Sequence, residues 1–255
     1  MTKYYLINGQ IHDIDDLYHH GIKGMKWGRR RYQNADGTLT AAGRERYRNP
    51  DGTLTDEGKE DYAKRLTDSA NEKNSWTRRD KMRKTAMESE DIKNIYDANA
   101  AVQAAKQKVI DTNKYSEEFY SDKDLQTEYK AKALKAMNKK WGYGLTDDEI
   151  DRMRETDDVY LWEDWDQGEG NSFQLYLKDR GVDPKKQWQQ IDTAYKEYDE
   201  ACKTAVEQLL GAYGNKPIRA WTTNTTVTEA TVEAMTRSLD DELAKRHMYG
   251  RYADL

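Results

Sequence analysis

Apolar residues recur every three or four positions through much of this chain, which is the spacing that places them on one side of a helix. This pattern predicts one helix over residues 85–112 and a second over residues 116–141, paired as an antiparallel hairpin across residues 113–115. The first helix carries the pattern at Ile92, Ile95, Asn99, Val102, Lys106 and Val109, and the second carries it at Leu125, Tyr129, Ala133 and Met137.

The clearest helix signal lies further along the chain. Asp183-Pro184 provides an N-cap residue followed by a proline suited to the first helical position. Apolar residues then follow heptad spacing up to Gly211, which indicates either a bundle helix or a seam for self-association. The residues of this seam are Trp188, Ile191, Tyr195, Tyr198, Cys202, Ala205 and Leu209.

Shorter elements are expected around these helices. Residues 4–7 favour a strand that runs into a turn at Asn8-Gly9, and residues 11–19 favour a helix. Thr146 and Glu149 form a capping box for a short helix that ends near Arg154. Residues 216–227 are β-branched and polar, typical of an extended arm or edge strand, and a last helix begins at Thr228.

These elements predict a mainly α fold, an elongated helical hairpin or bundle preceded by a small irregular motif region with two short turn-helix repeats. The expected division is a basic N-terminal region over residues 1–84, a helical hairpin over 85–156, and an acidic linker with a C-terminal helical region over 157–255. Only 36% of the 255 residues are hydrophobic and 35% are charged, so the apolar core is expected to be thin.

The two repeats run from Tyr32 to Tyr47 and from Tyr47 to Tyr62, with the pattern Y-x-N-x-D-G-T-L-T-x-x-G-[RK]-E-x-Y. Each Asp-Gly pair predicts a chain reversal, because Asp bonds the following backbone and Gly accepts positive φ. Thr40 and Thr55 then stand at N-cap positions. Each repeat is therefore expected to be a turn followed by a short helix.

A basic and aromatic segment precedes the repeats. Between Lys23 and Arg48 eight Lys and Arg face two acidic residues, although the net charge of the chain is −5. Three glycines lie close together and disfavour a helix, so we expect an irregular loop that presents cations and aromatic rings together. The alternative is a solvated basic loop with no partner. The residues expected to bind a partner are Lys23, Met25, Lys26, Trp27, Arg29, Arg30, Arg31 and Tyr32.

The stretch HHGIKGMKWGRRRYQNADGTLTAAGRERY resembles the HGIKGMKWG-x-RRYQN-x-DG-x-LT-x-x-GR-x-RY segment of proteins encoded in the head and structural gene modules of tailed bacteriophages of Gram-positive bacteria. The likeness spans His20 to Tyr47, and Arg29 stands where an aliphatic residue is expected. This resemblance implies a virion or virion-assembly protein that binds capsid or portal protein, or packaged DNA. It also implies a location in the virion and, during assembly, in the host cytoplasm.

Other chemistry has little support in the sequence. The single cysteine, Cys202, excludes an internal disulfide and is expected to be a buried structural thiol. No apolar run is long enough to span a bilayer, so no membrane partner is expected. An EF-hand loop beginning at Asp164 would place Gly168 and Leu175 at ligand positions, so the sequence favours an exposed acidic linker over a calcium site.

No Walker loop, GxSxG elbow, HExxH motif or Rossmann glycine pattern is present, and the four histidines have no cysteine at zinc spacing. We therefore expect no enzyme, cofactor or metal. Three functions remain, in this order: a phage structural or assembly protein, a phage-encoded inhibitor that binds a host factor through its acidic body, and a hydrolase. Self-association is expected through Trp188, Ile191, Tyr195, Tyr198 and Leu209.

Overall fold

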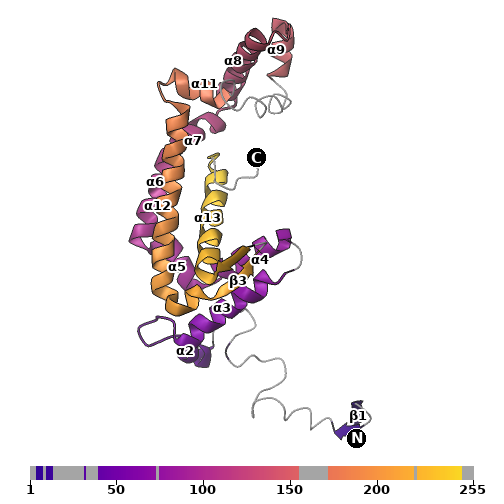
Figure 1. Ribbon diagram of the computed structural model, residues 1–255, viewed down its shortest axis with the longest axis vertical. Coiled ribbons are helices and arrows are strands. Elements are labelled where there is room, and N and C mark those ends of the chain that lie inside the picture. Colours follow the sequence, from indigo (N-terminus) through magenta and orange to yellow (C-terminus); the bar gives the residue numbers. More distant parts are fainter. Residues whose placement is uncertain are drawn as a thin grey trace. The chain divides into compact units, whose positions relative to one another are not determined.

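The protein is described here from a computed structural model that defines the backbone of residues 4–7, 10–13, 32, 40–72, 75–154, 172–220 and 223–248. Helices dominate these residues, which confirms the prediction of a mainly α fold (Figure 1). Contacts within the chain define two compact units, residues 1–62 and residues 63–255. The expected three-part division and the elongated form stay predictions.

The first unit opens with a β-hairpin. Strand β1 (Tyr4–Ile7) pairs antiparallel with β2 (Gln10–Asp13), and Ile7 lies opposite Gln10. The predicted turn at Asn8-Gly9 lies between these strands, outside the described residues. The predicted strand over residues 4–7 is confirmed. The predicted helix over residues 11–19 is wrong at residues 11–13, because pairing with β1 fixes them as a strand, and its remainder lies outside the described residues.

Two helices follow in the repeat region: α2 (Ala41–Tyr47) and α3 (Asp56–Ala70), which continues past the end of the first unit. The second unit then contains the helices α4 (Ser75–Met87), α5 (Glu90–Ala98), α6 (Ala100–Thr112), α7 (Lys114–Ser121), α8 (Lys123–Trp141), α9 (Asp147–Met153), α11 (Ser172–Asp179), α12 (Pro184–Leu210) and α13 (Val227–Lys245). A 3-10 turn, η1 (Gly211–Asn215), follows α12. The strands β3 (Pro217–Ala220) and β4 (Thr223–Thr226) pair antiparallel, so the predicted extended segment over residues 216–227 is confirmed at these eight residues, while Val227 instead begins α13.

Polar caps divide the two helices that were predicted to be continuous. Asn99 ends α5 and also begins α6, where its side chain accepts from the amides of Ala101 and Val102. Asp122 likewise begins α8 by accepting from the amide of Leu125. A side chain that caps a new helix satisfies amides that would otherwise lack partners, so a break costs little at these positions. The predicted continuous helices over residues 85–112 and 116–141 are therefore wrong.

The helices also pair differently from the predicted hairpin. Helix α6 packs along α12, while α8 packs against α11 (Figure 1). Helix α12 also contacts α13, after the chain has reversed through η1, β3 and β4, and α13 packs on α4. The main core of the second unit thus joins segments that lie far apart in the sequence.

The heptad seam of α12 is part of this core. Ile191, Tyr195, Tyr198, Cys202 and Ala205 are buried, and the Tyr195 hydroxyl donates to Asp240 Oδ1 of α13 at 2.6 Å. Most of the seam is therefore occupied by contacts inside the chain, as in a bundle helix. Self-association through this seam stays a prediction, and of the seam residues only Trp188 at its beginning is exposed.

A second cluster, rich in aromatic residues, joins α7, α8 and α11. It consists of Phe119, Tyr129, Phe173, Tyr176 and Leu177, and it contains both phenylalanines of the chain. The ring centroids of Phe119 and Tyr176 are 5.1 Å apart, within the range of favourable aromatic contacts. This cluster holds α8 against α7 and α11, and a separate contact between Leu134 of α8 and Ile150 of α9 joins the two helices that flank the loop between them.

Candidate partner-binding site

Of the eight residues predicted to bind a partner, Tyr32 is described by the structure. Lys23, Met25, Lys26, Trp27, Arg29, Arg30 and Arg31 lie outside the described residues. The candidate site is therefore built from Tyr32 and the repeats that follow it. Tyr32 is half-buried, and its backbone takes part in the first repeat.

Three backbone and side-chain contacts define the second repeat. The amide of Thr55 donates to the Tyr47 carbonyl at 3.0 Å, and the Thr55 hydroxyl accepts from the amide of Gly58 at 3.1 Å. Thr55 thereby satisfies an amide in the first turn of α3, as an N-cap residue does. A Cβ atom on Gly58 would lie 2.4 Å from the Tyr47 carbonyl oxygen, so only glycine fits there without a shift of the backbone.

The first repeat has the same contacts. The amide of Thr40 donates to the Tyr32 carbonyl at 3.0 Å, and the Thr40 hydroxyl accepts from the amide of Gly43 at 3.1 Å. A Cβ atom on Gly43 would lie 2.2 Å from the Tyr32 carbonyl oxygen. The expected N-cap roles of Thr40 and Thr55 are confirmed. The contacts also explain why Tyr, Thr and Gly occur together in each copy: the helix start is locked onto the carbonyl of the preceding tyrosine.

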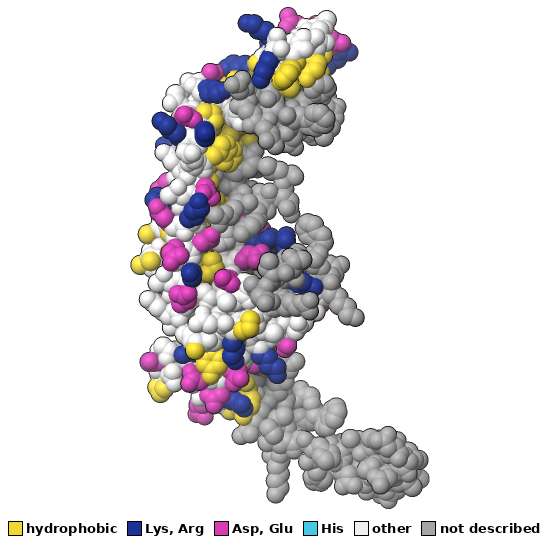
Figure 2. Space-filling model, in the orientation of Figure 1, with side chains coloured by type: hydrophobic (Ala, Val, Ile, Leu, Met, Phe, Trp, Pro, Cys, Tyr) yellow, Lys and Arg dark blue, Asp and Glu magenta, His cyan; other side chains and the backbone are white. Residues whose placement is uncertain are grey.

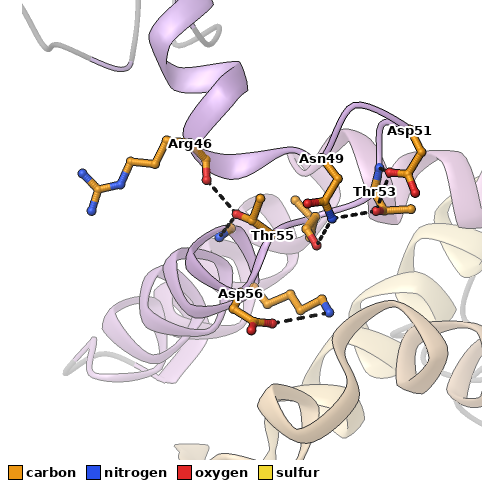
Figure 3. A network of polar contacts seen from close by, with 9 residues as sticks. Arg46, Asn49, Asp51, Thr53, Thr55 and Asp56 are labelled. Atoms are coloured by element: carbon orange, nitrogen blue, oxygen red, sulfur yellow. Dashed lines mark hydrogen bonds and ion pairs between the residues drawn. The ribbon is translucent and has the colours of Figure 1, made fainter.

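The turn of the second repeat is held by its own side chains (Figure 3). Asp51 Oδ1 accepts from both the amide and the hydroxyl of Thr53, at 2.9 and 2.7 Å, and these bonds lower the pKa of the Asp51 carboxyl. Gly52 has φ +85°, which glycine adopts without strain. The Asn49 side chain donates to the Thr53 hydroxyl at 3.0 Å. The predicted chain reversal at Asp51-Gly52 is thus confirmed, and its side chains serve the turn.

An arginine and two tyrosines form a stack on the first repeat. The Arg46 guanidinium lies 4.8 Å from the Tyr32 ring centroid and 5.7 Å from that of Tyr47, and the two rings meet edge to face at 5.9 Å. A hydrogen bond with the Tyr32 side chain raises the pKa of Arg46. Figure 3 shows the Arg46 side chain directed away from the turn. Arg46 is exposed, so the stack offers a fixed cation beside aromatic surface.

Sequence reasoning missed Arg46 and Tyr47 as members of this site. The signal was available in the repeat, because Tyr47 belongs to both copies and Arg46 directly precedes it. The position equivalent to Arg46 in the second copy is Asp61, so the cation belongs to the first copy alone. The candidate site thus extends the predicted basic and aromatic segment by one exposed cation on a folded support.

The described residues of this site are a cation and two aromatic rings, which are groups suited to binding a partner. No group of three His, Cys, Asp or Glu suited to a metal ion occurs among them. Cys202 is buried in the second unit, as predicted, and burial raises the pKa of its thiol to about 12, which keeps it protonated near neutral pH. None of the described helices is long and apolar enough to cross a membrane.

Comparison with known proteins points to the same part of the chain. The model of a family of unknown function, DUF7211, matches residues 13–34, which include the basic and aromatic segment up to Tyr32. No curated protein and no solved structure matches the chain.

Proposed function

We propose that this protein is a virion or virion-assembly protein of a tailed bacteriophage, and that residues 23–32 bind capsid protein, portal protein or packaged DNA. The observation that carries the proposal is the resemblance of residues 20–47 to a segment of phage head-module proteins. The family match over residues 13–34 supports the view that this segment is a sequence unit shared with other proteins.

The geometry of the first repeat supports a binding role for the segment. Tyr32 ends the segment, and its carbonyl accepts from Thr40 while its ring lies under Arg46. The end of the segment is therefore fixed to a folded element. Fixing one end of a binding segment reduces the conformational entropy that is lost when a partner binds.

Mass spectrometry of purified particles tests the proposal directly. The protein is expected at constant stoichiometry in virions or in assembly intermediates of the phage that encodes it. Its absence from both, together with recovery in complex with a host protein, would favour the alternative of a phage-encoded inhibitor.

Two variants then distinguish the partner. If packaged DNA is bound, replacing Arg29, Arg30 and Arg31 by Ala should weaken DNA binding, and each lost phosphate contact should reduce the salt dependence by about 0.7 to 0.9 in log–log slope. If a protein groove is bound, Trp27→Ala should have the larger effect on particle incorporation, because a buried aromatic anchor contributes about 2 kcal/mol or more.

A matched control removes three positive charges elsewhere. Lys123, Lys185 and Lys186 are exposed on α8 and α12, and their triple Ala variant should incorporate and bind DNA as the wild type does. If the arginine triple variant and Trp27→Ala both behave like this control, residues 23–32 have no binding role.

A further inference from the structure

Two large aromatic side chains are exposed where α8 ends: Trp141 is the last residue of α8, and Tyr143 follows two positions later in the loop that leads to α9. Trp141 is 56% exposed and Tyr143 is 47% exposed, and with Trp188 they are the large hydrophobic side chains exposed among the described residues. An aromatic side chain left in water forgoes the free energy of burial, and such residues are enriched where proteins bind one another. This loop is therefore a candidate contact surface.

The loop is fixed in its conformation by its own contacts. Gly142 and Gly144 both have φ +69°, which directs the chain through two left-handed positions. The Asn138 side chain then bridges the loop: its Nδ2 donates to the Leu145 carbonyl at 2.8 Å, and its Oδ1 accepts from the Leu145 amide at 2.9 Å. The two aromatic residues therefore sit on a backbone that is already ordered, and ordering it on binding costs little.

A capping box fixes the far end of the loop. The amide of Glu149 donates to the Thr146 hydroxyl at 3.3 Å, and Glu149 Oε2 accepts from the Thr146 amide at 2.8 Å. The Asn138 side chain thus connects the loop to α8, and the Thr146–Glu149 pair connects it to α9. The predicted capping box is confirmed, and it belongs to this surface.

Charges of opposite sign flank the aromatic pair. The end of α8 carries Lys139 and Lys140, and the beginning of α9 carries Asp147 and Asp148. Figure 2 shows dark blue and magenta side chains close together over these two helices. Within the described part of the chain, neither the Lys139 ammonium nor the Asp148 carboxylate has an ion-pair or hydrogen-bond partner, although Asp147 pairs with Lys135 at 3.4 Å.

This arrangement suits a second copy of the same surface. In a two-fold interface the same patch is used by both copies, so a basic side on one copy meets the acidic side of the other. A polyanion such as nucleic acid fits less well, because the carboxylates of α9 would repel its phosphates. The patch therefore has the charge pattern of a self-complementary contact.

We propose that two copies of this protein associate through the α8–α9 loop, with Trp141 and Tyr143 at the centre and Lys139 of each copy facing Asp148 of the other. This contact is separate from residues 23–32 and does not depend on the function proposed for them. It places self-association at a surface other than the α12 seam.

Sedimentation of the purified full-length protein tests the contact. The weight-average mass should rise from monomer toward dimer as concentration increases, and added salt should reduce the association. Trp141→Ala should lower the association constant at least about tenfold, as expected for a central aromatic residue. Gln190→Ala, at an exposed position of α12, is the control and should associate as the wild type does.

Charge reversal gives a test that does not depend on the aromatic residues. Lys139→Glu alone and Asp148→Lys alone should each remain monomeric at concentrations where the wild type dimerises, because each places like charges opposite one another. An equimolar mixture of the two variants should dimerise again, since both contacts then join opposite charges.

A wild type that stays monomeric at all concentrations would overturn the proposal, as would a Trp141→Ala variant that associates normally. Single charge-reversal variants that dimerise, or a mixture that does not, would also overturn the pairing of Lys139 with Asp148. Circular dichroism of each variant identifies a folding defect, and the mixture keeps the test valid if Trp141→Ala is unstable.

Discussion

Gly43 and Gly58 lie where a side chain would not fit, although glycine usually destabilises a helix. Glycine inside a helix usually costs about 1 kcal/mol relative to alanine, and the sequence alone indicates that these residues weaken α2 and α3. The structure shows that their missing Cβ atoms leave room for the carbonyls of Tyr32 and Tyr47. The sequence shows that both glycines recur in the repeat. It does not show that each one contacts the carbonyl of the tyrosine eleven positions earlier, because that contact depends on the path of the chain between them.

Gly58→Ala is therefore expected to destabilise the repeat region. The added methyl group overlaps a backbone oxygen, and overpacking of this kind typically costs about 1 to 3 kcal/mol. Hydrogen exchange at the amides of α2 and α3 would measure the loss. As a control, Ala42→Gly, at an exposed position of α2, should cost only about 0.5 to 1 kcal/mol. A Gly58→Ala variant with slower exchange would contradict the close contact with Tyr47.

Cys202 gives a second prediction at this scale. Burial raises the pKa of its thiol to about 12, so the reactive thiolate is scarce at neutral pH. The folded protein should react with iodoacetamide much more slowly than the same protein in denaturant, and mass spectrometry would follow the added group. Equal rates in the two states would mean that the thiol is accessible.

At the scale of elements, the helix type was predictable and the helix ends only partly so. Asp183-Pro184 and the Thr146–Glu149 capping box predict the starts of two helices, and the structure has α12 and α9 beginning there. The breaks at Asn99 and Asp122 were missed because apolar spacing continues across them. Asn and Asp occur both inside and at the ends of helices, so only the path of the next segment shows that these two act as caps.

Helix pairing was less predictable than helix existence. A three-four apolar stripe requires burial, but it does not specify which other stripe covers it. The hairpin of neighbouring helices was the simplest choice, and the structure instead pairs α6 with α12. The same limit applied to the heptad seam of α12, whose spacing suits an intramolecular bundle and an oligomer equally well.

The cap of α13 leads to a prediction about pH. Glu229 accepts from the Thr226 amide at 2.7 Å, and this bond lowers the pKa of its carboxyl below the ordinary value of 4.5. A group whose pKa is lowered by folding adds stability above its unfolded pKa and loses it as pH falls through the folded value. The free energy of unfolding should therefore fall as the pH drops below about 4.5.

Glu229→Gln should flatten this pH dependence, because the amide oxygen still accepts a hydrogen bond but no longer titrates. Urea unfolding at pH values on both sides of the ordinary carboxyl pKa would measure the change. Glu207→Gln, on the exposed side of α12, is the control and should leave the slope nearly as in the wild type. An unchanged slope in Glu229→Gln would show that other carboxylates dominate.

At the scale of the whole molecule, the division after Tyr62 can be tested by truncation. The aromatic cluster and the core between α6, α12 and α13 both consist of residues beyond position 62. A fragment of residues 56–255, which keeps α3 complete, should therefore retain the helical circular dichroism signal of its helices and a cooperative thermal transition. A fragment that unfolds gradually would show that the core needs residues 1–55.

For the whole molecule, the sequence predicted the fold better than it predicted the binding surfaces. Charge and aromatic content marked residues 23–32, and the structure describes the last of them, Tyr32, as part of a folded repeat. The α8–α9 surface was not foreseen, because its evidence is the exposure of Trp141 and Tyr143. Exposure depends on which helices cover which faces, and spacing alone does not fix that.

The shared tyrosine of the repeats has a consequence for how this chain can change in length. Tyr47 closes one copy and supplies the carbonyl on which the next copy begins, as Tyr32 does for the first copy. Duplicating residues 48–62 would add a copy whose two ends match its neighbours, and we expect it to add helix in circular dichroism without disturbing either original copy. Deleting the same fifteen residues should likewise join compatible ends. The length of the repeat region can therefore change in steps of one copy.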